Sequence, residues 1–202
     1  MNCWALRKVL TEKWDLIILH QYSQYATSYD QWLTKSDNGY LPQLTIMIHS
    51  LQPHAMLGTY IVHSYGNGYK FNYEGISYAR WKNISNAVRR MTMEFPAFLA
   101  VIPYGTAIQN LHSSYSDASG MDMTRDGTHL GYGLARFTAS VCLFQTLFSK
   151  RYGVSVNDIH FSYKCTEDER NQYSEGCTDM TEENLQLALS STLNACNNPY
   201  GM

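Results

Sequence analysis

Three short apolar runs divide the first half of the chain, and they constrain its fold more than any other feature. They occupy residues 14–20, 55–62 and 98–102, a length that suits one buried strand each. Between them, apolar residues recur at steps of three and four, which predicts amphipathic helices. Strands that alternate with helices in this way pair in parallel through right-handed crossovers. The sequence therefore predicts an α/β fold with a parallel sheet.

Each predicted helix has one apolar face. In the helix predicted at 76–94, Ile76, Ile84, Val88, Met91 and Phe95 face inward, whereas Arg80, Arg89 and Arg90 face outward. In the long helix that ends near residue 150, the inward residues are Leu134, Phe137, Val141, Phe144 and Phe148. Thr181 is predicted to cap the last helix, whose shared face comprises Leu185, Leu189, Thr192 and Cys196. Further helices are expected at 3–13, 41–51 and 106–114, and residues 157–176 are expected to be polar and irregular.

Length and charge exclude several classes of protein. The 202 residues suit one domain with a substantial core. A formal net charge of −2, with no basic cluster larger than a pair such as Arg89 and Arg90, argues against a nucleic-acid partner. No run of about 18 apolar residues occurs, so no membrane span is expected, and residues 1–8 lack the apolar core of a signal peptide. Sixteen tyrosines suit polar ligands such as carbohydrates.

Five cysteines do not decide the redox compartment. Cys165 and Cys177 flank a polar loop, and they could form a disulfide or remain thiols. Cys142 falls on the apolar helix and is predicted to be a buried thiol. No C-x-x-C pair is present, so the sequence predicts no cysteine-based metal site.

An acid and a histidine stand three residues apart in segment 124–130, which reads T-R-D-G-T-H-L. Gly127 disfavours a helix here, because glycine costs about 1 kcal/mol relative to alanine in a helix. In a short loop, the Asp126 carboxylate can reach Nδ1–H of His129 and leave Nε2 free to take a proton from a hydroxyl nucleophile. The alternative is a helix N-terminus that Asp126 or Thr128 caps, with His129 merely exposed. The spacing alone leaves both open.

Three segments together resemble the C-terminal part of an SGNH (GDSL-like) hydrolase, and in particular a poorly characterised branch common in gut bacteria. They are I-P-Y-G-T-A-I-Q-N at 102–110, D-G-T-H-L at 126–130 and G-L-A-R-F at 133–137. In that family the D-x-x-H-L element supplies the acid and base of a catalytic triad, so the resemblance implies these roles for Asp126 and His129. It also implies a three-layer α/β/α fold with a flavodoxin-like sheet. The implied substrate is an ester, such as an acylated carbohydrate, and no metal or organic cofactor is implied.

The family's nucleophilic serine lies in a Gly-Asn-Ser or Gly-Asp-Ser turn after the first strand, and neither turn occurs here. We therefore expect residues 1–202 to form a single SGNH-like domain that lacks its first strands at the N-terminus and is inactive alone. A signal peptide in such a missing segment would make the protein secreted or periplasmic. The sequence itself leaves the localisation and the oligomeric state open.

The family's Gly-x-Asn-Asp block is also absent, and residues 19–23 (L-H-Q-Y-S) stand in its place. The Gln21 amide could donate to a developing oxyanion, or it could bond to backbone groups of its own loop. Ser23 is the best internal candidate for a substrate-binding or reactive hydroxyl, although the family's nucleophile does not lie at this position.

Two other interpretations remain open. A non-catalytic carbohydrate-binding or interaction module with the same fold would explain the many tyrosines and the absent nucleophile. Alternatively, His20, His63 and His112 could gather with Asp126 and His129 as a metal site, because imidazole and carboxylate groups are good ligands. Neither H-x-H nor H-E-x-x-H spacing supports that site.

Overall fold

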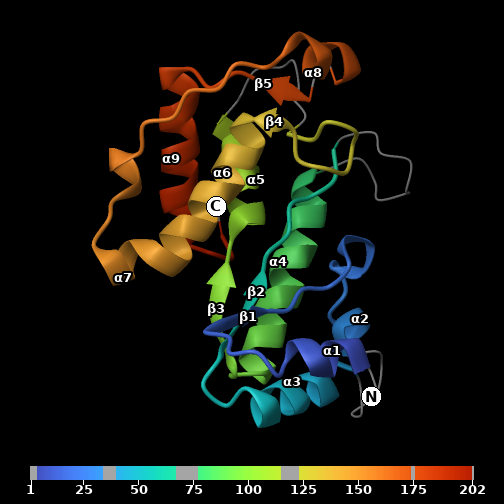
Figure 1. Cartoon of the computed structure of the whole chain (residues 1–202). Helices are drawn as coiled ribbons and strands as arrows, with labels where there is room; N and C mark the ends of the chain where they lie inside the picture. The colour runs from blue at the N-terminus through green and yellow to red at the C-terminus, as the bar shows by residue number, and fades with distance from the viewer. Residues whose placement is uncertain (1–3, 34–39, 67–76, 115–122, 174–175, 202) are drawn as a thin grey trace.

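The computed structural model describes residues 4–33, 40–66, 77–114, 123–173 and 176–201. Its centre is a parallel sheet in the order β1-β2-β3, formed by Leu16–Ile18, Met56–Tyr60 and Phe98–Ile102. Each strand falls within one of the predicted apolar runs, although β1 is shorter than its run. Helices flank this sheet (Figure 1), so the predicted three-layer α/β/α fold is confirmed.

The helices of the first half pack against the sheet. They are α1 (Trp4–Val9), α2 (Tyr29–Leu33), α3 (Tyr40–Leu51) and α4 (Ser77–Glu94), with a short 3-10 helix at Ser23–Tyr25. The predicted inward residues Ile84, Val88 and Met91 of α4 are fully buried, in one cluster with strand residues such as Leu57 and Phe98. Burial of each such side chain stabilises the fold by about 1.5–3 kcal/mol. This cluster is the first core of the molecule.

Helices of the second half form a second core. The elements are α5 (Tyr104–Ser114), β4 (Tyr132–Gly133), α6 (Leu134–Phe144), a π-helix (Gln145–Ser149), α7 (Lys150–Tyr152), a 3-10 helix (Val156–Asp158), α8 (Glu167–Gln172), β5 (Cys177–Thr178) and α9 (Glu182–Asn197). Helices α5, α6 and α9 pack together (Figure 1) around buried residues that include Leu111, Leu134 and Leu189. The cap predicted for α9 is confirmed, because Thr181 accepts a hydrogen bond from the backbone of Asn184. Cys142 is a buried thiol, as predicted.

A glycine joins the two cores. Gly105, in the first turn of α5, donates its backbone N–H to the carbonyl oxygen of Ile61 just beyond β2, at 2.7 Å. A Cβ atom at this position would lie 2.2 Å from the carbonyl oxygen of Val62. Only glycine therefore allows α5 to begin directly against the end of β2.

The prediction that Arg80 faces solvent is wrong. Its side chain is buried, with 4% of the residue exposed, because α4 begins beneath the loops that follow β1 and β2. Nη2 donates to the carbonyl oxygen of Ser23 at 2.5 Å, and the guanidinium lies 3.8 Å from the centre of the Tyr65 ring. Arg89 and Arg90, later in the same helix, are exposed as predicted. Ile76 lies outside the described residues, and Phe95 is only half-buried.

Two further predictions for the second half need correction. Phe148 is 40% exposed rather than inward, because it lies in the π-helix at Gln145–Ser149, which interrupts the 3.6-residue period. Residues 157–176 are not irregular throughout, since α8 lies within them. Thr166 and Glu169 form a capping box at its start, which compensates for the absence of buried residues in this helix.

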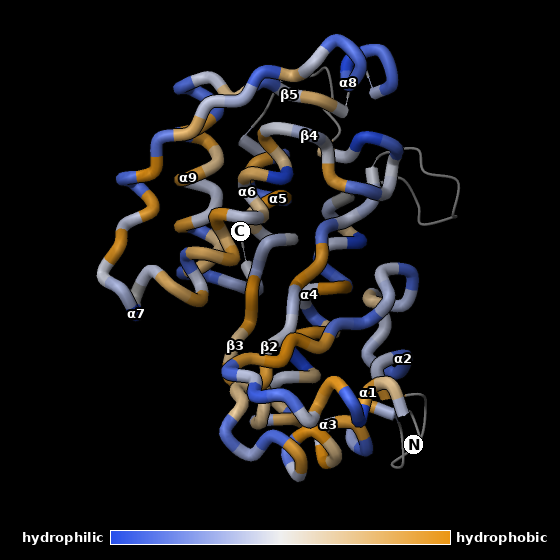
Figure 2. Tube along the Cα trace, in the orientation of Figure 1, coloured by the Kyte–Doolittle hydropathy of each residue, from blue (hydrophilic) through white to orange (hydrophobic). Residues whose placement is uncertain are grey.

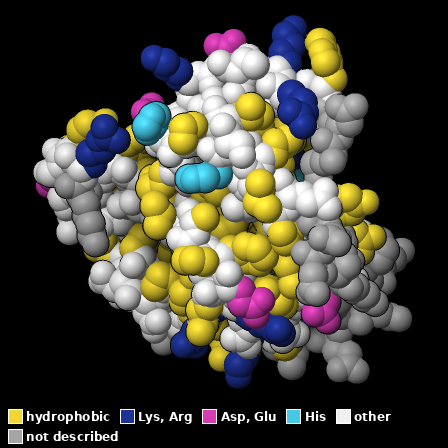
Figure 3. All heavy atoms as spheres, turned by 90° about the horizontal axis from the view of Figure 1, so that it is seen from below, with side chains coloured by type: hydrophobic (Ala, Val, Ile, Leu, Met, Phe, Trp, Pro, Cys, Tyr) yellow, Lys and Arg dark blue, Asp and Glu magenta, His cyan; other side chains and the backbone are white. Residues whose placement is uncertain are grey.

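The two ends of the molecule differ in surface character. Trp4, Val9, Ile46 and Leu51 are exposed on α1 and α3 at the lower end in Figure 1. Figure 3, which views the molecule from below, shows hydrophobic side chains gathered at this end. The segment that carries Asp126 and His129 lies at the opposite end, near α8, which is strongly hydrophilic in Figure 2. Within the described residues, no helix combines the length and apolar character needed to cross a membrane.

Candidate functional site

Residues 123–131 form a compact turn beside the carboxyl end of β2, and we call this turn the dyad loop. The backbone N–H of Gly66 donates to the carbonyl oxygen of Gly127 at 2.8 Å. His63 Nε2 lies 2.8 Å from the carbonyl oxygen of Thr128 and must donate to it, because a carbonyl oxygen can only accept. Ligands of open α/β sheets bind at this edge. The dyad loop therefore lies where the topology favours a site.

Backbone hydrogen bonds close the dyad loop. The N–H of Arg125 donates to the carbonyl oxygen of His129 at 2.8 Å, and the N–H of Gly131 donates to that of Met123 at 2.9 Å. At the tip, Gly127 has a φ of 83°, a left-handed conformation that residues with side chains rarely adopt. The loop is thus held in one shape by its own backbone.

Asp126 and His129 are in direct contact within this turn. Oδ2 of Asp126 lies 2.7 Å from Nδ1 of His129, while Oδ1 accepts the backbone N–H groups of His129 at 2.8 Å and Thr128 at 3.1 Å. Because a carboxylate only accepts hydrogen bonds, Nδ1 carries the proton and Nε2 of the neutral ring is the acceptor. The alternative of a helix cap is wrong, since α6 begins only at Leu134 and follows Gly133.

The imidazole is open to solvent, and the carboxyl is held in its anionic form. The His129 side chain is 66% exposed, and among the described residues none bonds to its Nε2. Partial burial opposes the ionisation of Asp126, but hydrogen bonds from the backbone and ring of His129 and from Thr128 outweigh it, so the pKa of the carboxyl lies well below its usual range. The anion can therefore stabilise a protonated imidazole.

Arg125 is a neighbour of the dyad that the sequence analysis missed. Its Nε lies 3.8 Å from Oδ2 of Asp126, and its Nη1 donates to the hydroxyl of Tyr132 at 2.8 Å. The guanidinium also lies 5.1 Å and 5.4 Å from the ring centres of Tyr132 and Tyr173. The adjacency of Arg125 to Asp126 is visible in the sequence and could have indicated this role. The contact with Tyr173, far along the chain, could not be predicted from sequence. The contacts tie the base of the dyad loop to the segment that follows it.

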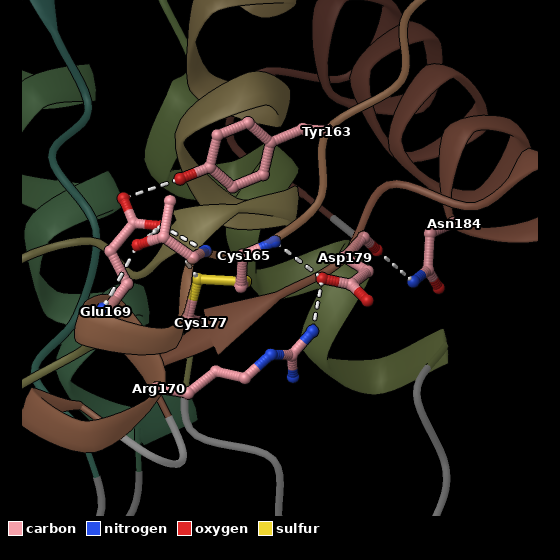
Figure 4. The surroundings of a disulfide bond; sticks show 8 residues. Tyr163, Cys165, Glu169, Arg170, Cys177, Asp179 and Asn184 are labelled. Atoms are coloured by element: carbon pink, nitrogen blue, oxygen red, sulfur yellow. Dashed lines mark hydrogen bonds and ion pairs between the residues drawn. A yellow bond between two sulfur atoms is a disulfide. The ribbon is translucent and has the colours of Figure 1, made fainter.

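A disulfide secures that following segment. β4 pairs in parallel with β5, and the N–H of Tyr132 donates to the carbonyl oxygen of Gly176 at 2.8 Å. Cys177, the first residue of β5, is joined to Cys165 by a disulfide (Figure 4), so of the two states left open by the sequence the paired one is present. We call described residues 163–173 and 176–180 the cap segment. Its anchored strand holds β4, and β4 follows His129 by only three residues.

Polar contacts organise the cap segment around its disulfide. Asp179 accepts the backbone N–H of Cys165 at 2.7 Å and an N–H of Arg170 at 2.6 Å. The hydroxyl of Tyr163 donates to Glu169 at 2.6 Å, and this hydrogen bond raises the pKa of Tyr163 to about 12. Figure 4 shows these side chains directed at one another around the two sulfur atoms. The cap segment is therefore held mainly by directional contacts rather than by a core of its own.

Gln21 and Ser23 lie in the segment after β1. Both polar atoms of the Gln21 amide bond to backbone groups. Nε2 donates to the carbonyl oxygen of Gln31, and Oε1 accepts the N–H of Tyr22, each at 2.8 Å. This agrees with the backbone-bonding alternative, although Nε2 has a second hydrogen. Ser23 Oγ lies 3.0 Å from the hydroxyl of Tyr65, and the next residue, Gly66, bonds through its backbone to Gly127 of the dyad loop. The structure thus joins Asp126 to His129 directly, and Ser23 only through intermediate residues.

The histidines considered as metal ligands have other contacts. His20 Nδ1 lies 3.2 Å from the carbonyl oxygen of Gln21, and His63 is occupied by Thr128. In the part of the chain that the structure describes, no group of three or more potential ligands is close enough to hold a metal ion. His63 instead packs against Tyr104, with ring centres 5.9 Å apart. It supports the dyad loop from below.

Comparisons with known proteins place the chain in a family. No curated protein matches it. The chain is similar to the crystal structure, at 1.50 Å resolution, of a DUF4886 family protein from Bacteroides uniformis ATCC 8492, with a TM-score of 0.76 and 24% sequence identity. The match covers 98% of this chain and 68% of that one, and at this identity it shows the fold alone. The model of the family described as "Domain of unknown function (DUF4886)" matches residues 6–172, and the chain therefore belongs to that family.

Proposed function

We propose that this chain carries the acid–base half of a serine-esterase site of the SGNH type, which acts on ester bonds such as those of acylated carbohydrates. The observation that carries the proposal is the 2.7 Å contact between Asp126 and Nδ1 of an exposed His129. A carboxylate that holds one ring nitrogen protonated leaves the other as a base directed at solvent. The D-x-x-H-L element of the SGNH family has the same two residues at the same spacing.

The proposed reaction uses each group in turn. A serine hydroxyl attacks the ester carbonyl while His129 Nε2 removes its proton, and the imidazolium then protonates the leaving alcohol. Asp126 stabilises the imidazolium throughout, because its depressed pKa keeps it anionic. Backbone N–H groups, with the second hydrogen of the Gln21 amide, would bear the oxyanion. Neither a metal nor an organic cofactor takes part.

The proposal assigns the serine to residues encoded upstream of Met1. Neither Gly-Asp-Ser nor Gly-Asn-Ser occurs within residues 1–202, and Ser23 lies against Tyr65 rather than against His129. On this proposal the 202-residue chain alone does not turn over esters, whereas the chain extended upstream does. A stop codon upstream of Met1 with no such turn before it would contradict the assignment.

Turnover of p-nitrophenyl acetate by the upstream-extended chain tests the proposal. We expect hydrolysis that disappears in His129→Ala and persists in His160→Ala, a matched change at an exposed histidine remote in sequence from the dyad loop. Both variants should unfold at the same denaturant concentration as the parent protein. Equal turnover in the parent and in His129→Ala would refute the proposed role. Loss of activity with a chelator would instead favour a metal-dependent hydrolase.

The second candidate function is a non-catalytic carbohydrate-binding module. Tyr22 and Tyr25 favour it, because these residues are 58% and 51% exposed and their ring centres lie 5.8 Å apart beyond the carboxyl end of β1. Exposed aromatic rings suit the apolar faces of sugars. If the extended chain binds glycans and hydrolyses no ester, this second function is the correct one.

A further inference from the structure

Two thiols face each other where α6 packs against α9. Sγ of Cys142 and Sγ of Cys196 lie 3.9 Å apart, although the residues are 54 positions apart in sequence. Cys142 is completely buried, whereas Cys196 is partly exposed. Both sulfurs belong to a small cluster with Ala107 and Ala195, whose short side chains leave the sulfurs in contact. The pair is separate from the dyad loop and from the Cys165–Cys177 disulfide.

Small movements would bring the sulfurs within bonding distance. A disulfide requires a separation of about 2.05 Å, which rotation of the two side chains and a slight shift of one helix can provide. Cys196 is in the last turn of α9, which ends at Asn197, and helix ends adjust more easily than helix centres. Thr146 Oγ1 lies 3.6 Å from Sγ of Cys196 and donates to the carbonyl oxygen of Cys142 at 2.8 Å. Thr146 therefore contacts both cysteines and helps to keep them next to each other.

We infer that Cys142 and Cys196 are a modification site at which a small disulfide oxidant, of the glutathione disulfide class, forms a second intramolecular disulfide. The thiolate of the partly exposed Cys196 attacks the oxidant and breaks its S–S bond, and the released thiolate takes up the proton that Cys196 lost. The sulfur of Cys142 then attacks the mixed disulfide, and the second thiol leaves with the proton of Cys142. Two protein thiols and one oxidant disulfide give one protein disulfide and two small thiols.

The order of these steps follows from the surroundings of the two sulfurs. The contact with Cys196 and burial raise the pKa of the Cys142 thiol, so it is a poor first nucleophile. Cys196 is the sulfur that solvent can reach. The bond would join the last turn of α9 to the last turn of α6, whose first residue is four positions after Leu130. Oxidation would thus stiffen the helix pair that supports the dyad loop.

Peptide mapping of the 202-residue chain after incubation with glutathione disulfide tests this inference. We expect a linked peptide pair containing Cys142 and Cys196, a mass lower by two hydrogens, and a higher midpoint of thermal unfolding. Cys3→Ser, which changes the fifth cysteine, should give the same linked pair. Cys142→Ala should instead stop at a glutathione adduct on Cys196. A parent protein that retains the adduct on Cys196, remains a dithiol or links either residue to Cys3 would overturn the inference.

Discussion

The sheet and the dyad loop are held by different kinds of interaction. Around the sheet, side chains such as Ile61, Ile84 and Val88 are fully buried in one hydrophobic cluster, so their contribution is spread over a common core. The dyad loop and the cap segment depend on directional contacts, such as those of the Asp126 carboxylate, the Cys165–Cys177 disulfide and the left-handed Gly127. The sheet should therefore be sensitive to substitutions that remove side-chain volume. The dyad loop should be sensitive to substitutions that change a polar group but keep its size.

The largest effect is expected from an isosteric substitution that removes the charge of Asp126. Asp126→Asn should lower kcat for p-nitrophenyl acetate by about 10³–10⁴-fold in the upstream-extended chain, because an amide no longer fixes the ring tautomer or stabilises the imidazolium. Asp158→Asn, at an exposed position of a 3-10 helix, is the matched control and should leave kcat unchanged. A kcat within twofold of the parent protein for Asp126→Asn would mean that the carboxylate is not part of the site.

Loss of volume should be costly in the sheet core and harmless on its surface. Ile48 and Ile46 lie on the same helix, α3, with 1% and 68% of the residue exposed. Ile48→Ala should lower the free energy of unfolding by about 2–5 kcal/mol, whereas Ile46→Ala should change it by less than about 0.5 kcal/mol. Urea denaturation measures both. Equal losses from the two variants would show that the packing of α3 differs from the one described.

The cap segment should respond to loss of its single crosslink. Replacing both Cys165 and Cys177 with serine should lower the free energy of unfolding by about 3 kcal/mol, as the entropy of closing a loop between cysteines 12 positions apart suggests. In hydrogen exchange of this double variant, the N–H of Tyr132, which bonds to the cap segment, should exchange first. The N–H of Ala100, in the sheet, should exchange later. Simultaneous loss at both positions would contradict the separation between cap segment and sheet.

Helix caps should distinguish the cap segment from the second core. Thr166→Ala removes the capping box of α8 and should cost about 1 kcal/mol, mostly as local fraying, because α8 buries no side chain. Thr181→Ala removes the cap of α9, which lies in the second core, and should instead lower the midpoint of global unfolding. Urea denaturation combined with hydrogen exchange separates the two. A purely global effect of Thr166→Ala would show that α8 unfolds with the core.

The smallest expected effect is the pH dependence of stability at Asp126. The pKa of the carboxyl in the folded protein is below its usual 3.8, so ionisation favours the folded state. This contribution is complete above about pH 5 and is lost as the pH falls below about 4 towards the folded-state pKa. The difference in free energy of unfolding between the parent protein and Asp126→Asn should therefore be larger at neutral pH than in acid. A difference that grows in acid would have the wrong sign.

The parts held by apolar burial could be predicted from sequence. The pattern of apolar residues predicted the positions of the three strands and of α4, because burial selects apolar residues along a whole face of an element. The same period assigned Arg80 to the polar face of α4, and this was wrong. The loops after β1 and β2 cover its side chain and contact it through Ser23 and Tyr65. No local pattern contains that information. Phe148 was misplaced because one π-turn changes the period without a sequence signal.

The site was only partly predictable. The contact between Asp126 and His129 is local, three residues apart around a glycine, so its chemistry can be deduced from the segment itself. Arg125 and the β4–β5 pair could not be, since they depend on Tyr173 and Gly176, more than forty residues further along the chain. Gln21 was open between two roles, and only its neighbours Gln31 and Tyr22 show which groups its amide contacts.

Nitrogen NMR of the His129 ring tests the contact on which the proposed function depends. In the parent protein with the ring neutral, the shifts should show a protonated Nδ1 and a bare Nε2, because Oδ2 of Asp126 lies 2.7 Å from Nδ1. Asp126→Asn should shift the ring towards the opposite tautomer. A parent protein in which Nε2 carries the proton and Nδ1 is bare would contradict both the contact and the esterase chemistry built on it.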